Sequence, residues 1–90
     1  MYEVLYSDEV IKEDLPKVSE PWKSKIKNAI ESKLMTRPEV YGKPLRRSLK
    51  NYRKLRVGDY RVVFRVEEQK VKIFVIQHRS VVYATASKRL

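Results

Sequence analysis

Three strand-like runs joined by two-residue connections constrain the fold of this chain more than any other feature. The runs are rich in β-branched and aromatic residues and occupy residues 51–57, 60–67 and 70–78. Gly58-Asp59 is typical of a tight hairpin turn, and Glu68-Gln69 is a second connection of the same length. Strands joined in this way pair antiparallel. The sequence therefore predicts a three-stranded antiparallel meander.

The N-terminal half predicts one strand and two helices. Residues 2–6 alternate as a strand, and Ser7 is a cap candidate for a first helix that ends at Leu15-Pro16. A second helix begins at Ser19-Glu20-Pro21 and ends before Arg37-Pro38. Its apolar stripe comprises Trp22, Ile26, Ile30 and Leu34.

The remaining segments complete the predicted fold. Residues 38–50 read as a loop, and residues 82–90 as a short helix or tail. We expect a single α+β domain over residues 1–90, in the order β-α-α-β-β-β. The two helices of the N-terminal half pack on one face of a small, curved, mainly antiparallel sheet.

The two turns also predict which side chains share a face. The Gly58-Asp59 turn pairs Arg56 with Arg61 and Lys54 with Val63, so that Lys54, Arg56 and Arg61 share the face away from the helices. Tyr52 lies farther along this face. The register of the second turn places Phe74, Ile76 and His78 there as well.

Positive charge is concentrated in the second half. Residues 1–42 carry a net charge of −1, and residues 43–90 carry +11. The loop contributes basic residues at Lys43, Arg46, Arg47 and Lys50. This charge favours a polyanionic partner, nucleic acid first. A solvated basic face, as on many RNA-associated proteins, stays open as the structural interpretation. Like charges placed opposite each other are destabilising. The pairing of Arg56 with Arg61 therefore favours a functional interpretation of the basic face.

Composition excludes several classes of function. The chain has no cysteine, one histidine and, after residue 42, only Asp59, Glu67 and Glu68 as acids. Thiolate chemistry is excluded, and we expect no carboxylate-bound metal, no cofactor and no histidine pair for acid–base catalysis. Apolar runs reach at most four residues, and the start lacks signal-peptide character, so we expect a cytoplasmic protein without a membrane partner.

The predicted basic face suits metal-free cleavage of RNA. Attack by the 2′-OH on the adjacent phosphate needs a base, an acid and cations that stabilise the phosphate charge. A lysine crowded by two arginines gives up its proton more easily, and arginine forks match phosphate oxygens. A tyrosine can stack on a base. His78 is interpreted either as a structural residue at a strand end or as a participant in proton transfer.

Three segments resemble the RelE/ParE toxin superfamily. The stretch Leu55-Arg56-Val57-Gly58-Asp59-Tyr60-Arg61-Val62-Val63-Phe64 is similar to its central hairpin. Gly42-Lys43-Pro44-Leu45 and His78-Arg79-Ser80-Val81-Val82-Tyr83 are similar to its flanking segments. The resemblance implies a RelE-like fold over nearly the whole chain. Its RelE branch implies a ribosome-dependent endoribonuclease that cuts mRNA in the A site without metal.

The resemblance also implies residue roles. Lys54 matches a catalytic lysine and base, and Arg61 matches the arginine that stabilises the phosphate. Arg79 matches an acid or phosphate ligand, and Tyr83 matches the tyrosine that stacks on an mRNA base. Some RelE enzymes have a second lysine where this chain has Tyr52. Arg56 can supply that charge, and His78 can share proton transfer. We expect RNA contacts from Arg56, Tyr52, Arg53, Lys50, Arg46, Arg47 and Lys43.

The resemblance implies partners as well. These are a RelB-type antitoxin, the ribosome with its small-subunit rRNA, mRNA, and operator DNA reached only through the antitoxin. An antitoxin helix covering exposed Val63 and Phe74 is one expected contact. Two alternatives stay open: a ParE-like, non-enzymatic inhibitor of DNA gyrase, and a basic RNA-binding module without catalysis.

Overall fold

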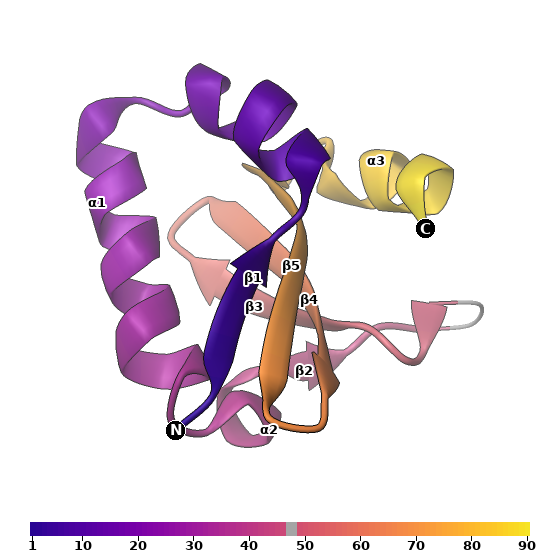
Figure 1. The fold of residues 1–90 in the computed structure, drawn as a ribbon. Helices are drawn as coiled ribbons and strands as arrows, with labels where there is room; N and C mark the ends of the chain where they lie inside the picture. Colours follow the sequence, from indigo (N-terminus) through magenta and orange to yellow (C-terminus); the bar gives the residue numbers. More distant parts are fainter. Residues whose placement is uncertain (47–48) are drawn as a thin grey trace.

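The computed structural model describes residues 1–46 and 49–90, which are organised around a five-stranded sheet (Figure 1). Its strands are β1 (Glu3–Tyr6), β2 (Lys43–Pro44), β3 (Arg53–Val57), β4 (Tyr60–Glu67) and β5 (Lys70–His78). They lie in the order β1-β5-β4-β3-β2, with β1 parallel to β5 and the other neighbours antiparallel. The predicted meander and the mainly antiparallel sheet are thus confirmed.

The first helical segment lies between β1 and α1. The Val10 amide donates to Ser7 Oγ at 3.3 Å, which confirms Ser7 as the cap. Helical turns continue through η1 (Val10–Asp14) and η2 (Leu15–Lys17), two residues beyond the predicted end at Leu15. Pro16 is tolerated there because it falls in the first turn of η2, where its missing amide has no helical partner.

The second helix comprises α1 (Glu20–Ala29) and η3 (Ile30–Leu34). Its apolar residues repeat every four positions, which is longer than the 3.6 residues of an α-helical turn, so the stripe would rotate around a regular helix. The last turn is wider, with the Met35 amide donating to the Ile30 carbonyl five residues earlier. The wider turn keeps Ile30 and Leu34 in the core with Ile26.

Part of the predicted loop over residues 38–50 forms regular secondary structure. Pro38–Tyr41 form the short helix α2, and Lys43 and Pro44 pair with Lys54 and Arg53 as the edge strand β2. Proline is acceptable at both places because it sits at a helix start and on a sheet edge.

Two apolar clusters lie on opposite faces of the sheet. On the α1 face, the two N-terminal helices cover Val62, Phe64 and Ile73. On the α3 face, α3 (Val82–Arg89) covers Val63 and Val75. Val63 is fully buried by this helix, so the expectation of a surface Val63 for an antitoxin is wrong. None of the described helices is long and apolar enough to cross a membrane.

The β3–β4 turn has the predicted register. Val57 pairs with Tyr60, Arg56 with Arg61, and Lys54 with Val63. Gly58 has a φ of +59°, which side-chain-bearing residues rarely adopt. The Trp22 ring of α1 packs on this glycine so closely that an added Cβ would lie 2.3 Å from it. The β3–β4 turn therefore packs the hairpin closely against α1.

Candidate functional site

Basic side chains gather on the α3 face of β3 and β4. Lys54 and Arg56 project from β3, and Arg61 projects from β4 directly opposite Arg56. The edge strand β2 adds Lys43, whose Cα pairs with that of Lys54. Together with Tyr41 and Tyr83, these four cations form what we call the Lys54 cluster. Its charges come from three adjacent strands, so their side chains repeat across one surface.

Lys54 is joined to the C-terminal helix. Its Nζ donates to the Tyr83 hydroxyl at 3.1 Å and lies 5.3 Å from the centre of the Tyr83 ring. Tyr83 stands in the first turn of α3 and is 39% exposed. The amine is thus held beside an aromatic ring whose surface remains open to a stacking partner.

Two shallow hollows flank Lys54. One, of about 330 Å³, is lined by Pro44, Leu45, Arg46, Leu49, Lys54 and Tyr83. The other, of about 240 Å³, is lined by Tyr41, Lys43, Lys54, Arg56 and Arg61. No acidic side chain belongs to either lining among residues 1–46 and 49–90. Lys54 belongs to both, so an anion in either hollow would meet its ammonium group.

Arg61 is braced by its own turn. Its Nη1 donates to the carbonyls of Gly58 and Tyr60, both at 2.9 Å. These bonds limit the rotamers of a long side chain and reduce the entropy that a phosphate contact would otherwise cost. Arg61 is thus preorganised at the rim of the smaller hollow.

Arg79 follows the end of β5 and lies beside the β3–β4 turn, outside the Lys54 cluster. Its amide donates to the Asp59 carbonyl at 2.8 Å, and its Nε lies 3.8 Å from the Asp59 carboxylate. Its side chain is 62% exposed. An ion pair this long and this exposed holds Arg79 weakly.

His78 does not share the face of Arg61, contrary to the sequence prediction. A bulge between Val63 and Phe64 shifts the β4–β5 register, so that His78 pairs with Tyr60, and Ile76 turns into the core on the α1 face. The His78 ring packs edge-on against Tyr60 at 5.9 Å, and its Nδ1 accepts the Ser80 amide at 3.2 Å. The two-residue turn fixed the register only up to the bulge.

Only some of the predicted RNA-binding residues lie at the two hollows. Lys43, Arg56 and Arg46 line the hollows, and Lys50 is exposed in the turn before β3. Arg53 points to the α1 face, where its Nη1 donates to the Gly42 carbonyl at 2.8 Å. Arg47 lies outside the described residues.

Tyr52 packs inside the α3-face cluster. Its ring meets Phe74 edge-on at 5.6 Å, and Arg65 lies 5.8 Å over it. Phe74 is half-buried by these contacts. Tyr52 and Arg53 therefore have structural contacts, whereas Lys43, Arg46 and Arg56 remain accessible to a ligand.

Sequence reasoning missed two features around the site. Tyr41 lines the smaller hollow, and it was overlooked because its segment read as loop. The second is a buried carboxylate, Asp14, bonded to Arg89 of α3. A signal for it existed, since Asp14 follows Val10 by four residues on the apolar stripe of its helix.

The chemistry of the cluster is that of an anion site. Among the described residues, no three histidine or acidic side chains come together in a way that could hold a metal ion. The cluster instead presents ammonium and guanidinium donors, which match phosphate oxygens. An exposed aromatic ring beside them suits a nucleobase.

The chain is similar to known proteins in family and in fold. Residues 4–83 match the family described as the ParE toxin of the type II toxin–antitoxin system, parDE. No curated protein sequence matches the chain significantly.

Solved structures of toxins share the fold. The toxin–antitoxin complex RelBE2 from Mycobacterium tuberculosis matches at 30% identity and a TM-score of 0.71, over 87% of this chain and 98% of that one. The RelB–RelE complex from Methanococcus jannaschii matches at 23% identity and 0.70, over 90% and 96%. E. coli RelE with a RelB peptide matches at 22% and 0.66, over 99% and 97%.

Proposed function

The chain belongs to the ParE toxin family of type II toxin–antitoxin systems, within the RelE/ParE superfamily, and we propose that it is a ribosome-dependent endoribonuclease. It cleaves mRNA in the ribosomal A site without a metal ion and thereby stops translation in the cytoplasm. The observation that carries this proposal is the Lys54–Tyr83 contact at 3.1 Å, next to Arg56 and Arg61 in an acid-free hollow.

The reaction fits the groups at hand. Lys54 is the proposed general base: once its ammonium group has released a proton to water, the amine takes the proton of the ribose 2′-OH. The 2′-oxygen then bonds to phosphorus while the bond from phosphorus to the 5′-oxygen breaks. The products are a 2′,3′-cyclic phosphate and a 5′-hydroxyl, whose proton comes from water. No oxidant, metal or other co-reactant is needed.

The arginines stabilise charge rather than move protons. A guanidinium keeps its proton throughout the physiological pH range, which favours the phosphate-ligand role for Arg79 over an acid role. Arg61, with Arg56 beside it, donates to the non-bridging oxygens as negative charge builds up in the transition state. Arg79 is exposed and weakly paired, so it can leave Asp59 for the RNA backbone.

Tyr83 positions the substrate by stacking on a base, and Lys43, Arg46 and Lys50 bind the RNA backbone or small-subunit rRNA. The place of His78 beside Tyr60 gives it no contact with the Lys54 cluster, so we leave it out of the proposed catalytic set.

A cognate antitoxin of the RelB type inhibits the toxin in this proposal. The three similar structures named above are all complexes of a toxin with an antitoxin or an antitoxin peptide. Acidic antitoxin segments complement the +11 charge of residues 43–90. Operator DNA is reached only through the antitoxin.

The name of the matching family favours a second candidate, a non-enzymatic inhibitor of DNA gyrase. This candidate predicts no RNA cleavage and loss of gyrase supercoiling activity. A basic RNA-binding module would show neither effect, but it would bind RNA in a salt-dependent manner.

Primer extension on a defined mRNA tests the proposal. Purified protein is added to naked mRNA and to programmed ribosomes, as wild type, Lys54→Met and Arg61→Ala. Lys27→Met is the matched control, since Lys27 is exposed on α1 at the opposite face of the sheet. We expect cuts only with ribosomes, lost in both cluster variants and retained in the control.

Other outcomes contradict the proposal in distinguishable ways. Cuts in naked mRNA would remove the ribosome dependence but keep the nuclease. Cuts that persist in Lys54→Met and Arg61→Ala would show that the Lys54 cluster is not the active site. A complete absence of cuts would direct the next test to gyrase supercoiling.

A further inference from the structure

A buried carboxylate lies between η1, β5 and α3. The Asp14 side chain is fully buried, and each of its oxygens accepts two hydrogen bonds. The Ile76 amide and Gln77 Nε2 donate at 2.9 Å, and Nη1 and Nη2 of Arg89 each donate at 2.8 Å. The Arg89 pair is a two-pronged fork, the strongest geometry for this type of contact.

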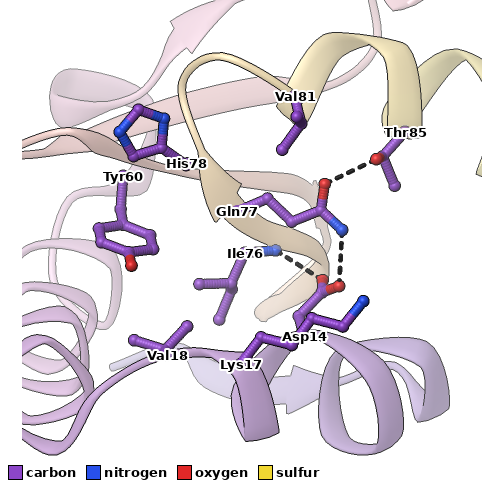
Figure 2. A pocket seen from close by; sticks show the side chains of 9 residues that line it. All are labelled: Asp14, Lys17, Val18, Tyr60, Ile76, Gln77, His78, Val81 and Thr85. Atoms are coloured by element: carbon purple, nitrogen blue, oxygen red, sulfur yellow. Dashed lines mark hydrogen bonds between the residues drawn. The ribbon is translucent and has the colours of Figure 1, made fainter.

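Thr85 extends the arrangement along α3. Its hydroxyl donates to Gln77 Oε1 at 2.6 Å, and Figure 2 shows Gln77 reaching between Thr85 and Asp14. Thr85 and Arg89 of α3 therefore both lead to the same carboxylate, and Arg89 Nη1 also donates to the Phe74 carbonyl of β5 at 3.0 Å. We call Asp14, Gln77, Thr85 and Arg89 the Asp14 clamp.

Helix α3 depends on polar contacts of this kind to keep its position on the sheet. Val82–Arg89 span only eight residues, and helices of this length are unstable alone in water. Its buried apolar side chains are Val82 and Ala86, of which one is a single methyl group. Little hydrophobic burial holds the helix, so its exact seat on the sheet depends on directional polar bonds.

The seat of α3 determines where Tyr83 lies. Tyr83 is two residues from Thr85 on the same helix and contacts Lys54 at 3.1 Å. A rotation or slide of α3 would move the Tyr83 ring away from Lys54. Displacements of about 1 Å can cost about 100-fold in rate where reacting groups must be aligned.

We propose that Asp14 and Arg89 are positioning residues that act at the candidate active site through α3. By holding the C-terminal end of the helix, the clamp keeps Tyr83 against Lys54 and aligned with the RNA. This inference rests on the proposed function, and its first test does not require catalysis.

The first test examines α3 in the full chain by NMR. Arg89→Lys keeps the charge but removes the fork. Arg37→Lys is the control, because Arg37 is exposed and precedes α2. We expect α3 amides to exchange at least about 10-fold faster in Arg89→Lys, with β4 amides unchanged, and the NOE between Lys54 and the Tyr83 ring to disappear. Unchanged α3 exchange with a retained NOE would overturn the proposal, whatever the enzyme does.

The second test is a double-mutant cycle on single-turnover cleavage, measured over a range of ribosome concentrations up to saturation. Arg89→Lys should lower the single-turnover rate about 10-fold or more, with KM changed less than about twofold. In a Tyr83→Ala background the same substitution should add less than about twofold, because its effect passes through Tyr83. If the rate losses of Arg89→Lys and Tyr83→Ala multiply in the double variant, Arg89 acts independently of Tyr83. That result would show a merely structural role for Arg89 and overturn the inference.

Asp14→Asn provides a second variant that retains the shape of the side chain, and Arg89→Lys decides the matter if Asp14→Asn does not fold. If the wild type cleaves no RNA, the proposed function fails, while the exchange and NOE measurements still decide whether the clamp positions Tyr83.

Discussion

The Tyr83 hydroxyl lies 3.1 Å from Nζ of Lys54, although 29 positions separate the two residues in the chain. The contact joins the last helix to an inner strand of the sheet across the hollow lined by Leu45 and Leu49. It brings a proton-accepting group and a stacking surface together, which is the combination that cleavage at a chosen nucleotide requires.

Tyr83→Ala and Tyr83→Phe separate stacking from the hydroxyl contact. Stacking on one base contributes about 1–3 kcal/mol, so Tyr83→Ala should slow cleavage about 5- to 150-fold. Tyr83→Phe keeps the ring and removes only the hydroxyl contact, so it should slow cleavage by less than about 10-fold, since one hydrogen bond contributes about 0.5–1.5 kcal/mol net. Single-turnover cleavage on programmed ribosomes measures both. Wild-type rates in Tyr83→Ala would remove Tyr83 from the site.

Arg56→Gln should stabilise the protein while weakening RNA binding. Arg56 faces Arg61 across the β3–β4 ladder, and relief of this repulsion is worth about 0.2–1 kcal/mol in the free energy of unfolding. Loss of one phosphate contact should lower the slope of log affinity against log salt by about 1. Urea unfolding followed by Trp22 fluorescence, and RNA titrations at several salt concentrations, measure the two effects.

Lys27→Gln removes one charge on α1 and serves as the control for Arg56→Gln. It should change neither quantity by a comparable amount. A destabilised Arg56→Gln would mean that Arg56 makes favourable contacts that outweigh the repulsion.

Gly58→Ala should destabilise the protein strongly. The φ of +59° costs a side-chain-bearing residue about 1–2 kcal/mol. The new Cβ would also lie 2.3 Å from the Trp22 ring, and forced repacking adds about 1–3 kcal/mol. Urea unfolding should show a total loss of about 2–5 kcal/mol. Asp59→Ala in the same turn is the comparison and should lose much less, and equal losses would refute the role given to Gly58.

Asp14 should contribute to acid unfolding. Burial alone would raise the pKa of Asp14, but the bonds from Arg89, Ile76 and Gln77 outweigh burial and hold the pKa below its ordinary value. Because the folded-state pKa is the lower one, the stabilisation is present above the unfolded-state pKa near 3.9 and is lost as pH falls below it. Glu13 lies 3.8 Å from Arg89, and Glu9 also interacts with the Arg89 charge.

The measurement compares wild type and Asp14→Asn in urea at several pH values. At pH 7 the variant should be less stable by about 3 kcal/mol, because it leaves Arg89 without its charged partner. The difference should shrink as pH falls below about 4, because the Asp14 carboxylate of the unfolded chain then takes up a proton more readily than that of the folded chain. A difference that stays constant down to pH 2 would contradict the assignment.

The sequence predicted the hairpin and its charged face because both depend on local rules. A two-residue turn at Gly58-Asp59 allows one register, and alternation then places Lys54, Arg56 and Arg61 together. The β4–β5 register was wrong beyond the bulge, because one extra residue reverses the facing of every later side chain, and His78 moved to Tyr60 for this reason.

The sequence by itself determined four of the five strands, the starts of the first two helical segments and the sign of the charge, since these follow from periodicity, caps, turns and composition over a few neighbouring residues. Only the tertiary structure decided that α3 folds back over Val63, that Tyr83 meets Lys54, and that Asp14 holds Arg89. Those contacts join residues from distant parts of the chain. Their formation depends on how helices and sheet pack as a whole, which no local pattern specifies.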